Sequence, residues 1–157
     1  MGGCGRNWSV SAEIPKGGAA MVANSQPYRL LIADDDPNFR DVLKVLFGPY
    51  FELLEAASGE EAVEIVEQRT VDIALLDMHM HELTGLETLR IVKTFHTVAP
   101  CILITADATD DLRRTATEAE AFSVLKKPVS RRELVATVSS ALTDAYEDPN
   151  PLSGLGF

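Results

Sequence analysis

Short apolar runs alternate with segments of helical periodicity five times along the middle of the chain. Such alternation predicts consecutive βα units. The predicted strands cover about residues 29–33, 51–56, 72–76, 101–105 and 122–126. The first, third and fourth of these runs are apolar almost throughout, which is typical of strands covered on both faces. The pattern therefore predicts an α/β fold, a (βα)5 doubly wound parallel sheet with helices on both sides.

The predicted helices carry start and stop signals. Asp36-Pro37 opens the first helix, because Asp is a good N-cap and Pro is tolerated in the first turn. Gly48-Pro49 ends that helix. Ser58-Gly59-Glu60-Glu61 and Ser130-Arg131-Arg132-Glu133 have the spacing of capping boxes, so a helix is expected after each serine. The two remaining helices are predicted at about residues 86–96 and 110–118.

These elements place one domain at about residues 28–146 of the 157-residue chain. Residues 1–27 contain five glycines and no apolar periodicity, which predicts a disordered leader or translated sequence upstream of a start at Met21. Residues 147–157 are predicted to be a disordered tail, because their prolines and glycines break any helix. The sequence thus predicts a stand-alone domain with no output domain after it.

The charge balance excludes one class of partner. Lys and Arg number 14 against 24 Asp and Glu, a formal net charge of -10. A broad nucleic-acid surface needs clustered basic residues, so no nucleic-acid partner is expected. No apolar run approaches the roughly 18 residues of a membrane span, and the N-terminus lacks a signal peptide's apolar region. We therefore expect no membrane association and a cytoplasmic location. Cys4 and Cys101 offer neither a disulfide framework nor metal-ligand spacing, and Cys101 is expected to be a buried thiol.

Polar side chains stand where four of the predicted strands stop. Asp34-Asp35 follows the first, Asp77 the third, Thr105 ends the fourth and Lys127-Pro128 follows the fifth. Open α/β sheets bind ligands outside the carboxyl ends of their strands, so these side chains are expected to converge. Three carboxylates, one hydroxyl and one ammonium suit a divalent cation together with a phosphoryl group.

Each residue type fits one part of that chemistry. Adjacent carboxylates at Asp34 and Asp35 approach one ion from different sides, and Mg²⁺ prefers oxygen ligands. Asp77 is suited to form an acyl phosphate as a nucleophile, with Lys127 as counter-charge and Thr105 as hydrogen-bond donor. Taken singly, each residue also has an ordinary interpretation: a helix or turn cap, a surface lysine, a strand end. The occurrence of all of these residues at four strand ends favours the functional interpretation.

The residues around these strand ends resemble a known family, the receiver domain of two-component response regulators. The resemblance covers about residues 29–145. It rests on Ala33–Arg40, on Leu75–Met80 with Gly85, on Ile104-Thr105-Ala106 and on Lys127-Pro128. It implies a flavodoxin-like fold with strand order 2-1-3-4-5. It also implies a signalling domain rather than an enzyme, one that at most takes up its own phosphoryl group and slowly releases it.

The resemblance also implies a role for each site residue. Asp77 would be the phosphoacceptor, taking its phosphoryl group from a histidine kinase or phosphotransfer protein. The implied ligands of Mg²⁺, or of another divalent cation, are Asp34, Asp35, Asp77 and the backbone carbonyl of His79. The implied phosphoryl-binding and switch residues are Thr105, Ala106 and Lys127. The two positions that tend to tune dephosphorylation are occupied by His79 and Asp107, so we expect an altered phosphoryl lifetime.

Three residues depart from the family pattern. His81 stands where a Pro usually follows the Met of the third loop, and Val124 occupies the position of the switch aromatic. Glu120 replaces the usual Gly between Ala119 and Ala121 and is expected to lose the left-handed helix terminus. The chemistry is thus expected to be intact, while the usual relay through an aromatic side chain is not.

Two other functions compete with phosphorylation-dependent signalling: a pseudo-receiver that binds partners without phosphorylation, and a phosphohydrolase with an aspartyl nucleophile. The phosphohydrolase is disfavoured, because such enzymes usually have a second Asp where His79 stands. A transition-metal site is disfavoured too, since of His79, His81 and His96 only the first two are close in sequence. A downstream partner or a homodimer is expected on the face formed by the fourth helix, fifth strand and fifth helix, whose segment 113–133 is locally basic.

Overall fold

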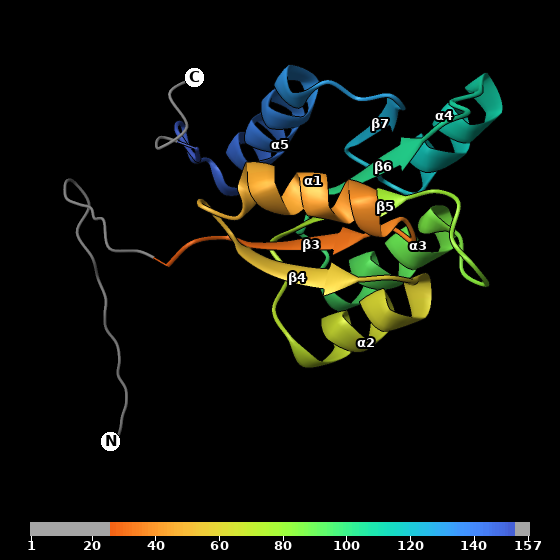
Figure 1. The fold of residues 1–157 in the computed structure, drawn as a ribbon, viewed down its shortest axis with the longest axis horizontal. Helices are drawn as coiled ribbons and strands as arrows, with labels where there is room; N and C mark the ends of the chain where they lie inside the picture. The colour runs from red at the N-terminus through yellow and green to blue at the C-terminus, as the bar shows by residue number, and fades with distance from the viewer. Residues whose placement is uncertain (1–25, 153–157) are drawn as a thin grey trace.

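The computed structural model describes residues 26–152, which form a five-stranded parallel sheet in the order β4-β3-β5-β6-β7 (Figure 1). In chain order this is 2-1-3-4-5, so the predicted flavodoxin-like topology is confirmed. The strands are β3 (Arg29–Ala33), β4 (Glu52–Ala56), β5 (Ile73–Asp77), β6 (Cys101–Thr105) and β7 (Ser123–Lys126). The helices are α1 (Pro37–Phe47), α2 (Gly59–Gln68), α3 (Gly85–Phe95), α4 (Asp110–Glu118) and α5 (Arg131–Tyr146).

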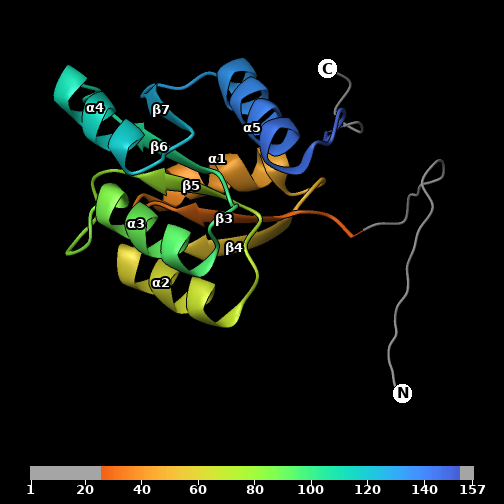
Figure 2. The same ribbon diagram turned by 180° about the vertical axis from the view of Figure 1, so that it is seen from behind.

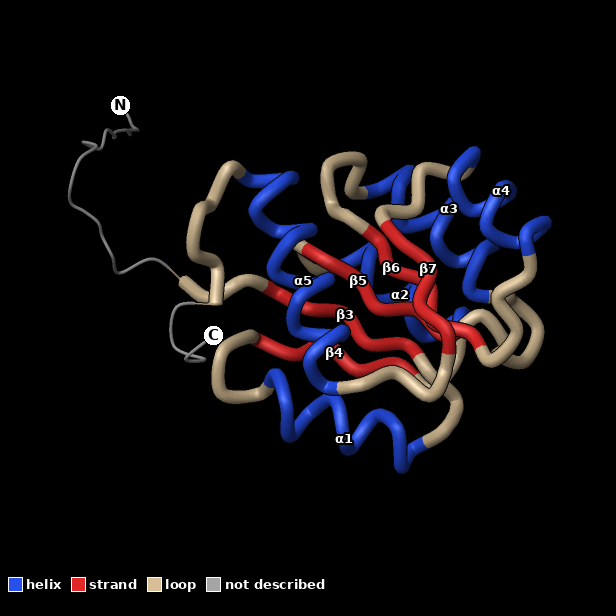
Figure 3. The backbone as a smooth tube through the Cα atoms, turned by 90° about the horizontal axis from the view of Figure 1, so that it is seen from above, coloured by secondary structure: helices blue, strands red, loops and turns tan. Residues whose placement is uncertain are grey.

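The sheet lies between two layers of helices, with α1 and α5 on one face and α2, α3 and α4 on the other (Figures 2 and 3). Successive strand residues point to opposite faces, and in β3 both sets are buried. Leu30 and Ile32 join the core beneath α1 and α5, whereas Leu31 and Ala33 join the core beneath α2 and α3. This two-sided burial explains why the central strands are apolar almost throughout.

The helices begin about where the sequence predicted, but some of their capping hydrogen bonds differ from the predicted ones. Ser58 accepts the Glu61 amide as predicted, but Glu61 Oε1 accepts the amide of Ala57 instead of completing the box. A complete capping box forms at Thr84 and Glu87, where none was predicted, and α3 begins there. That start holds the loop after β5 close to the sheet, next to the last strand residue.

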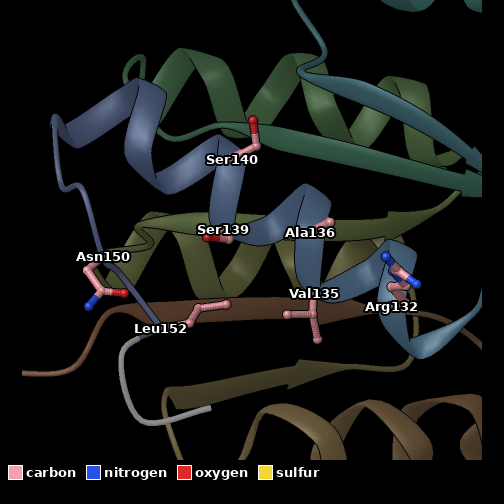
Figure 4. Close-up of a pocket in the computed structure, with 7 residues that line it drawn as sticks. All are labelled: Arg132, Val135, Ala136, Ser139, Ser140, Asn150 and Leu152. Atoms are coloured by element: carbon pink, nitrogen blue, oxygen red, sulfur yellow. The ribbon is translucent and has the colours of Figure 1, made fainter. Parts of the chain in front are cut away.

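The segment after α5 packs on the domain instead of leaving it as a tail. Leu152 is buried in the core beneath α1 and α5, and Asp148 Oδ2 accepts the Tyr28 hydroxyl at 2.7 Å. Tyr28 in turn stacks on Tyr146 with ring centroids 5.5 Å apart. A cavity of about 400 Å³ lies between α5 and this segment, beside Val135 and Leu152 (Figure 4). Helix α5 ends at Tyr146, and the residues after it up to Leu152 stay against the domain through these side-chain contacts.

Two further expectations concern single residues and the membrane. Cys101 is fully buried, and burial raises the pKa of its thiol to about 12, as expected for an inert side chain. Within residues 26–152, every helix is too short or too polar to cross a bilayer. The expectations for the leader, Met21 and Cys4, and for the last five residues of the tail, lie outside the described residues.

The backbone conformation of Glu120 differs from the one that the sequence predicted. Glu120 keeps the left-handed conformation at the end of α4, with φ of 68°, despite its side chain. The Glu120 amide donates to Thr117 O, and the Ala121 amide to Ala116 O, which completes a Schellman motif. Two satisfied carbonyls thus hold a non-glycine residue in a strained conformation.

Relief of this strain is expected to stabilise the domain. We expect Glu120→Gly to raise the free energy of unfolding by about 1 kcal/mol, since glycine adopts positive φ without steric cost. Urea denaturation measures the change. Glu120→Ala is the matched control, because it removes the carboxylate but keeps the Cβ atom. Equal stability of the Gly and Ala variants would contradict the strain argument.

Candidate functional site: an acidic pocket at the strand ends

The carboxyl ends of β3, β5, β6 and β7 meet at one edge of the sheet. Asp34 directly follows β3 and is 2% exposed, while Asp77 is the last residue of β5 and is 5% exposed. Thr105 ends β6 and is fully buried, and Lys127 directly follows β7. Parallel register brings these positions together, as the sequence predicted.

Local hydrogen bonds fix the loop that carries Asp34. One of its carboxylate oxygens accepts the Asp36 amide at 2.8 Å, and its backbone carbonyl accepts from Arg40 at 2.6 Å. Asp36 itself accepts the Asn38 amide and caps α1. Asp34 thus fixes the loop, Asp36 caps α1, and Asp35 is exposed.

The acidic pocket, as we call Asp34, Asp35 and Asp77, brings three carboxylates together. Each offers one oxygen, and these oxygens all lie within 4.8 Å of one another. Lys127 Nζ lies 3.2 Å from Asp34 Oδ2 and 3.2 Å from Asp77 Oδ1. The ammonium thus neutralises part of the negative charge that the fold gathers there.

Burial and charge shift the proton affinities in the pocket. Burial, and then the neighbouring Asp34 carboxylate, raise the pKa of Asp77, against the opposing pull of Lys127. For Lys127, burial alone would lower the pKa, but the carboxylates of Asp77 and Asp34 outweigh burial and raise it. Lys127 therefore stays charged, while Asp77 ionises less readily than an exposed aspartate.

The donor set of the acidic pocket fits a hard divalent cation. Ligands of an octahedral Mg²⁺ lie about 2.1 Å from the ion and so roughly 3 to 4 Å apart, close to the separations available here. Carboxylate oxygens are its preferred protein ligands. The described residues contain no other group of three or more candidate metal ligands, and no histidine belongs to this one.

Mg²⁺ is expected to stabilise the domain. At ten times its dissociation constant it should add about 1.4 kcal/mol to the free energy of unfolding. Asp35→Asn should lose most of this gain, whereas Asp36→Asn, the same change in charge at the N-cap, should keep it, since Asn also caps helices. Thermal unfolding with and without Mg²⁺ measures the gain. The stabilisation by Mg²⁺ should decrease at low pH, because a protonated Asp77 no longer offers a charged ligand. An equal gain in both variants would contradict this site.

The remaining predicted residues lie around the acidic pocket. His79 is exposed, and its Nε2 lies 3.3 Å from Thr105 Oγ1. Ala106 and Asp107 are exposed in the loop after β6, and the Asp107 amide donates to Thr105 Oγ1 at 3.1 Å. Val124 is half-buried against the core beneath α2 and α3. The roles assigned to these residues, and to the His79 carbonyl, stay predictions.

The other two histidines lie elsewhere. His81 is exposed, and His96 Nε2 contacts Val66 O at 3.0 Å beside α2. Neither histidine belongs to a group of three or more candidate metal ligands among the described residues.

The sequence did not indicate that two further residues, Phe39 and Arg40, contact the site. Phe39 lies beneath Lys127, with Nζ 4.6 Å from the ring centroid, a distance at which cation–π attraction operates. Arg40 pairs with Glu55 at 2.7 Å while it holds the Asp34 carbonyl. Their helical spacing indicated only a core position for Phe39, because contacts between α1 and the strand ends depend on the tertiary fold. Phe39 also lines an apolar groove of about 320 Å³ beside α1.

Comparison with known proteins identifies the family. The family model described as the response regulator receiver domain matches residues 30–139, more than half of the chain. The chain belongs to the response regulator receiver family. A CheY-like receiver domain protein from Methanospirillum hungatei has the same fold, with a TM-score of 0.75 at 24% identity. Their overlap covers 78% of this receiver chain and 98% of that one.

Longer regulators share this receiver sequence. Transcriptional regulatory protein ZraR of Klebsiella oxytoca is 31% identical over 79% of this chain, and response regulator protein PilR of Pseudomonas aeruginosa is 34% identical over 69%. The receiver chain spans only about a quarter of their lengths, 28% and 25%. A chain in the structure of a CheX-CheY-BeF3-Mg complex from Borrelia burgdorferi is 28% identical, with a TM-score of 0.70 over 74% of this chain and 90% of that one.

Proposed function

We propose that this receiver domain accepts a phosphoryl group on Asp77 and signals through the resulting change in charge. The arrangement of Asp77 supports the proposal most strongly. Asp77 is 5% exposed, its carboxylate lies beside the two other carboxylates of the acidic pocket, and it is 3.2 Å from the Lys127 ammonium. Phosphoryl transfer depends chiefly on positioning and on neutralising charge, and these groups supply both.

The attacking group in the transfer is the ionised carboxylate of Asp77. One carboxylate oxygen forms a bond to phosphorus, while the bond from phosphorus to the donor nitrogen breaks and its electron pair leaves with the donor imidazole. A divalent cation, when bound by Asp34, Asp35, Asp77 and the His79 carbonyl, would neutralise charge on the phosphoryl oxygens. Lys127 supplies a second positive charge, and Thr105 and Ala106 contribute hydrogen-bond donors from the end of β6.

The proposed donor is a histidine kinase or a phosphotransfer protein. The apolar groove beside α1 adjoins the site through Phe39, and Val42 and Val45 are 57% and 80% exposed there. Such a surface favours a protein that docks over a free small molecule.

The proposed output surface is the face of α4, β7 and α5, used by a downstream protein or by a second copy. The guanidinium of Arg113 on α4 donates to Val124 O on β7 at 3.2 Å and so links two elements of this face. Arg113 and Arg132 are exposed, which favours an acidic partner. With Val124 in place of the aromatic, the change at Asp77 would reach this face through the loop after β6.

Intact-mass spectrometry after incubation with acetyl phosphate and Mg²⁺ tests the proposal. We expect a stoichiometric adduct in the wild-type domain and none in Asp77→Ala. Asp41→Ala is the matched control, since it removes an exposed carboxylate on α1 outside the acidic pocket and should still form the adduct. The absence of a wild-type adduct would favour a pseudo-receiver instead. Sustained phosphate release at enzymatic turnover would favour the phosphohydrolase.

A further inference from the structure

A histidine side chain contacts the buried hydroxyl at the end of β6. His79 Nε2 lies 3.3 Å from Thr105 Oγ1, although His79 is exposed and Thr105 is fully buried. The same oxygen accepts the Asp107 amide at 3.1 Å. We propose that His79 is a positioning residue that holds the Thr105 hydroxyl in a resting orientation, and so weakens phosphoryl binding. The consequence for binding rests on the proposed function of Asp77.

The backbone around Thr105 is held from both sides. The Met78 amide donates to Ile104 O at 2.8 Å, and the Lys127 amide donates to Thr105 O at 2.7 Å. Because both neighbouring strand ends fix this backbone, the hydroxyl reorients by rotation of the side chain. The two contacts of the oxygen then decide which orientation is preferred.

A hydroxyl that turns toward a phosphoryl group must give up both contacts. Loss of the Asp107 contact frees the first part of the loop before α4, in which the Thr109 amide donates to Asp107 O at 3.1 Å. Thr109 in turn caps α4 by accepting the Leu112 amide. The His79 contact therefore opposes both phosphoryl binding and the release of this loop.

Beryllofluoride, a phosphoryl analogue, tests the inference in the whole chain with Mg²⁺ present. One net hydrogen bond corresponds to a few-fold change in binding, so His79→Ala should bind it about three- to tenfold more tightly. His79→Gln, which keeps a hydrogen-bonding side chain, should restore affinity toward that of the wild type. His81→Ala is the matched control, as an exposed histidine of the same loop, and should bind like the wild type.

A double-mutant cycle separates this contact from other effects of the imidazole. In a Thr105→Val background, His79→Ala should leave beryllofluoride affinity unchanged, because no hydroxyl remains to be held. An unchanged affinity of the single variant, or the same gain in the Thr105→Val background, would overturn the inference.

Amide hydrogen exchange tests the contact without any phosphoryl ligand. In His79→Ala the Asp107 amide should exchange several-fold faster, since its acceptor is no longer held in place. A wild-type domain that forms no adduct and binds no beryllofluoride would overturn the proposed function instead. The exchange measurement then decides alone: an Asp107 amide as protected as in the wild type would overturn the inference.

Discussion

Replacing Lys127 with alanine is expected to slow phosphoryl uptake from acetyl phosphate by about 100-fold. The ammonium lies 3.2 Å from both Asp34 and Asp77. Without it, the three carboxylates of the acidic pocket would repel an incoming phosphoryl group more strongly, because the pocket has lost one positive charge. The pKa of Asp77, already raised, would rise further without the opposing pull of Lys127. The initial rate of adduct formation, followed by intact mass, measures the loss.

The same substitution should have the opposite effect on metal binding. Lys127 competes with any cation for the Asp34 and Asp77 oxygens, so Lys127→Ala should bind Mg²⁺ about five- to tenfold more tightly in the absence of a phosphoryl donor. Lys126→Ala is the matched control, because Lys126 is exposed and next in sequence. Tighter Mg²⁺ binding together with slower uptake distinguishes a charge effect from a folding defect. Adduct formation by Lys127→Ala at the wild-type rate would contradict this role.

Gly85→Ala is expected to lower the free energy of unfolding by about 3 kcal/mol, with a midpoint about 10 °C lower. A Cβ atom at Gly85 would collide with the Asp77 carbonyl oxygen and lie 2.8 Å from Met78 Cα. Both are backbone atoms, which do not yield as a flexible side chain does. Since the displaced residue is the proposed phosphoacceptor, uptake by the folded fraction should fall about 100-fold as well. Urea denaturation and the initial rate of adduct formation measure the two effects.

Gly59→Ala is the matched control for this prediction. Its Cβ atom would meet Leu83 Cβ and Thr88 Oγ1, each at 2.6 Å, so it should also destabilise the domain. It does not press on the backbone of Asp77, and phosphoryl uptake by the folded fraction should be unchanged. Equal losses of uptake in both variants would show that stability alone, and not the position of Asp77, limits the reaction.

Local signals predicted most of the fold because each acts within a few residues. The apolar runs predicted all five strands of the described sheet to within a residue or so, and Asp36 and Ser58 cap helices where the sequence placed them. The left-handed conformation of Glu120 was mispredicted, and no signal in the sequence indicated the burial of Leu152. Both features depend on contacts that local preference does not record: the core beneath α1 and α5 covers Leu152, and a Schellman motif holds Glu120.

The sequence by itself determined the layered α/β fold and the set of polar residues at the strand ends, because alternation of apolar runs and parallel topology are readable from order and spacing. Only the tertiary structure decided which of these residues touch. It placed Lys127 between Asp34 and Asp77 and above Phe39, and it brought His79 to Thr105 across 26 positions of sequence. Such contacts depend on side-chain direction and loop path, which no periodicity records.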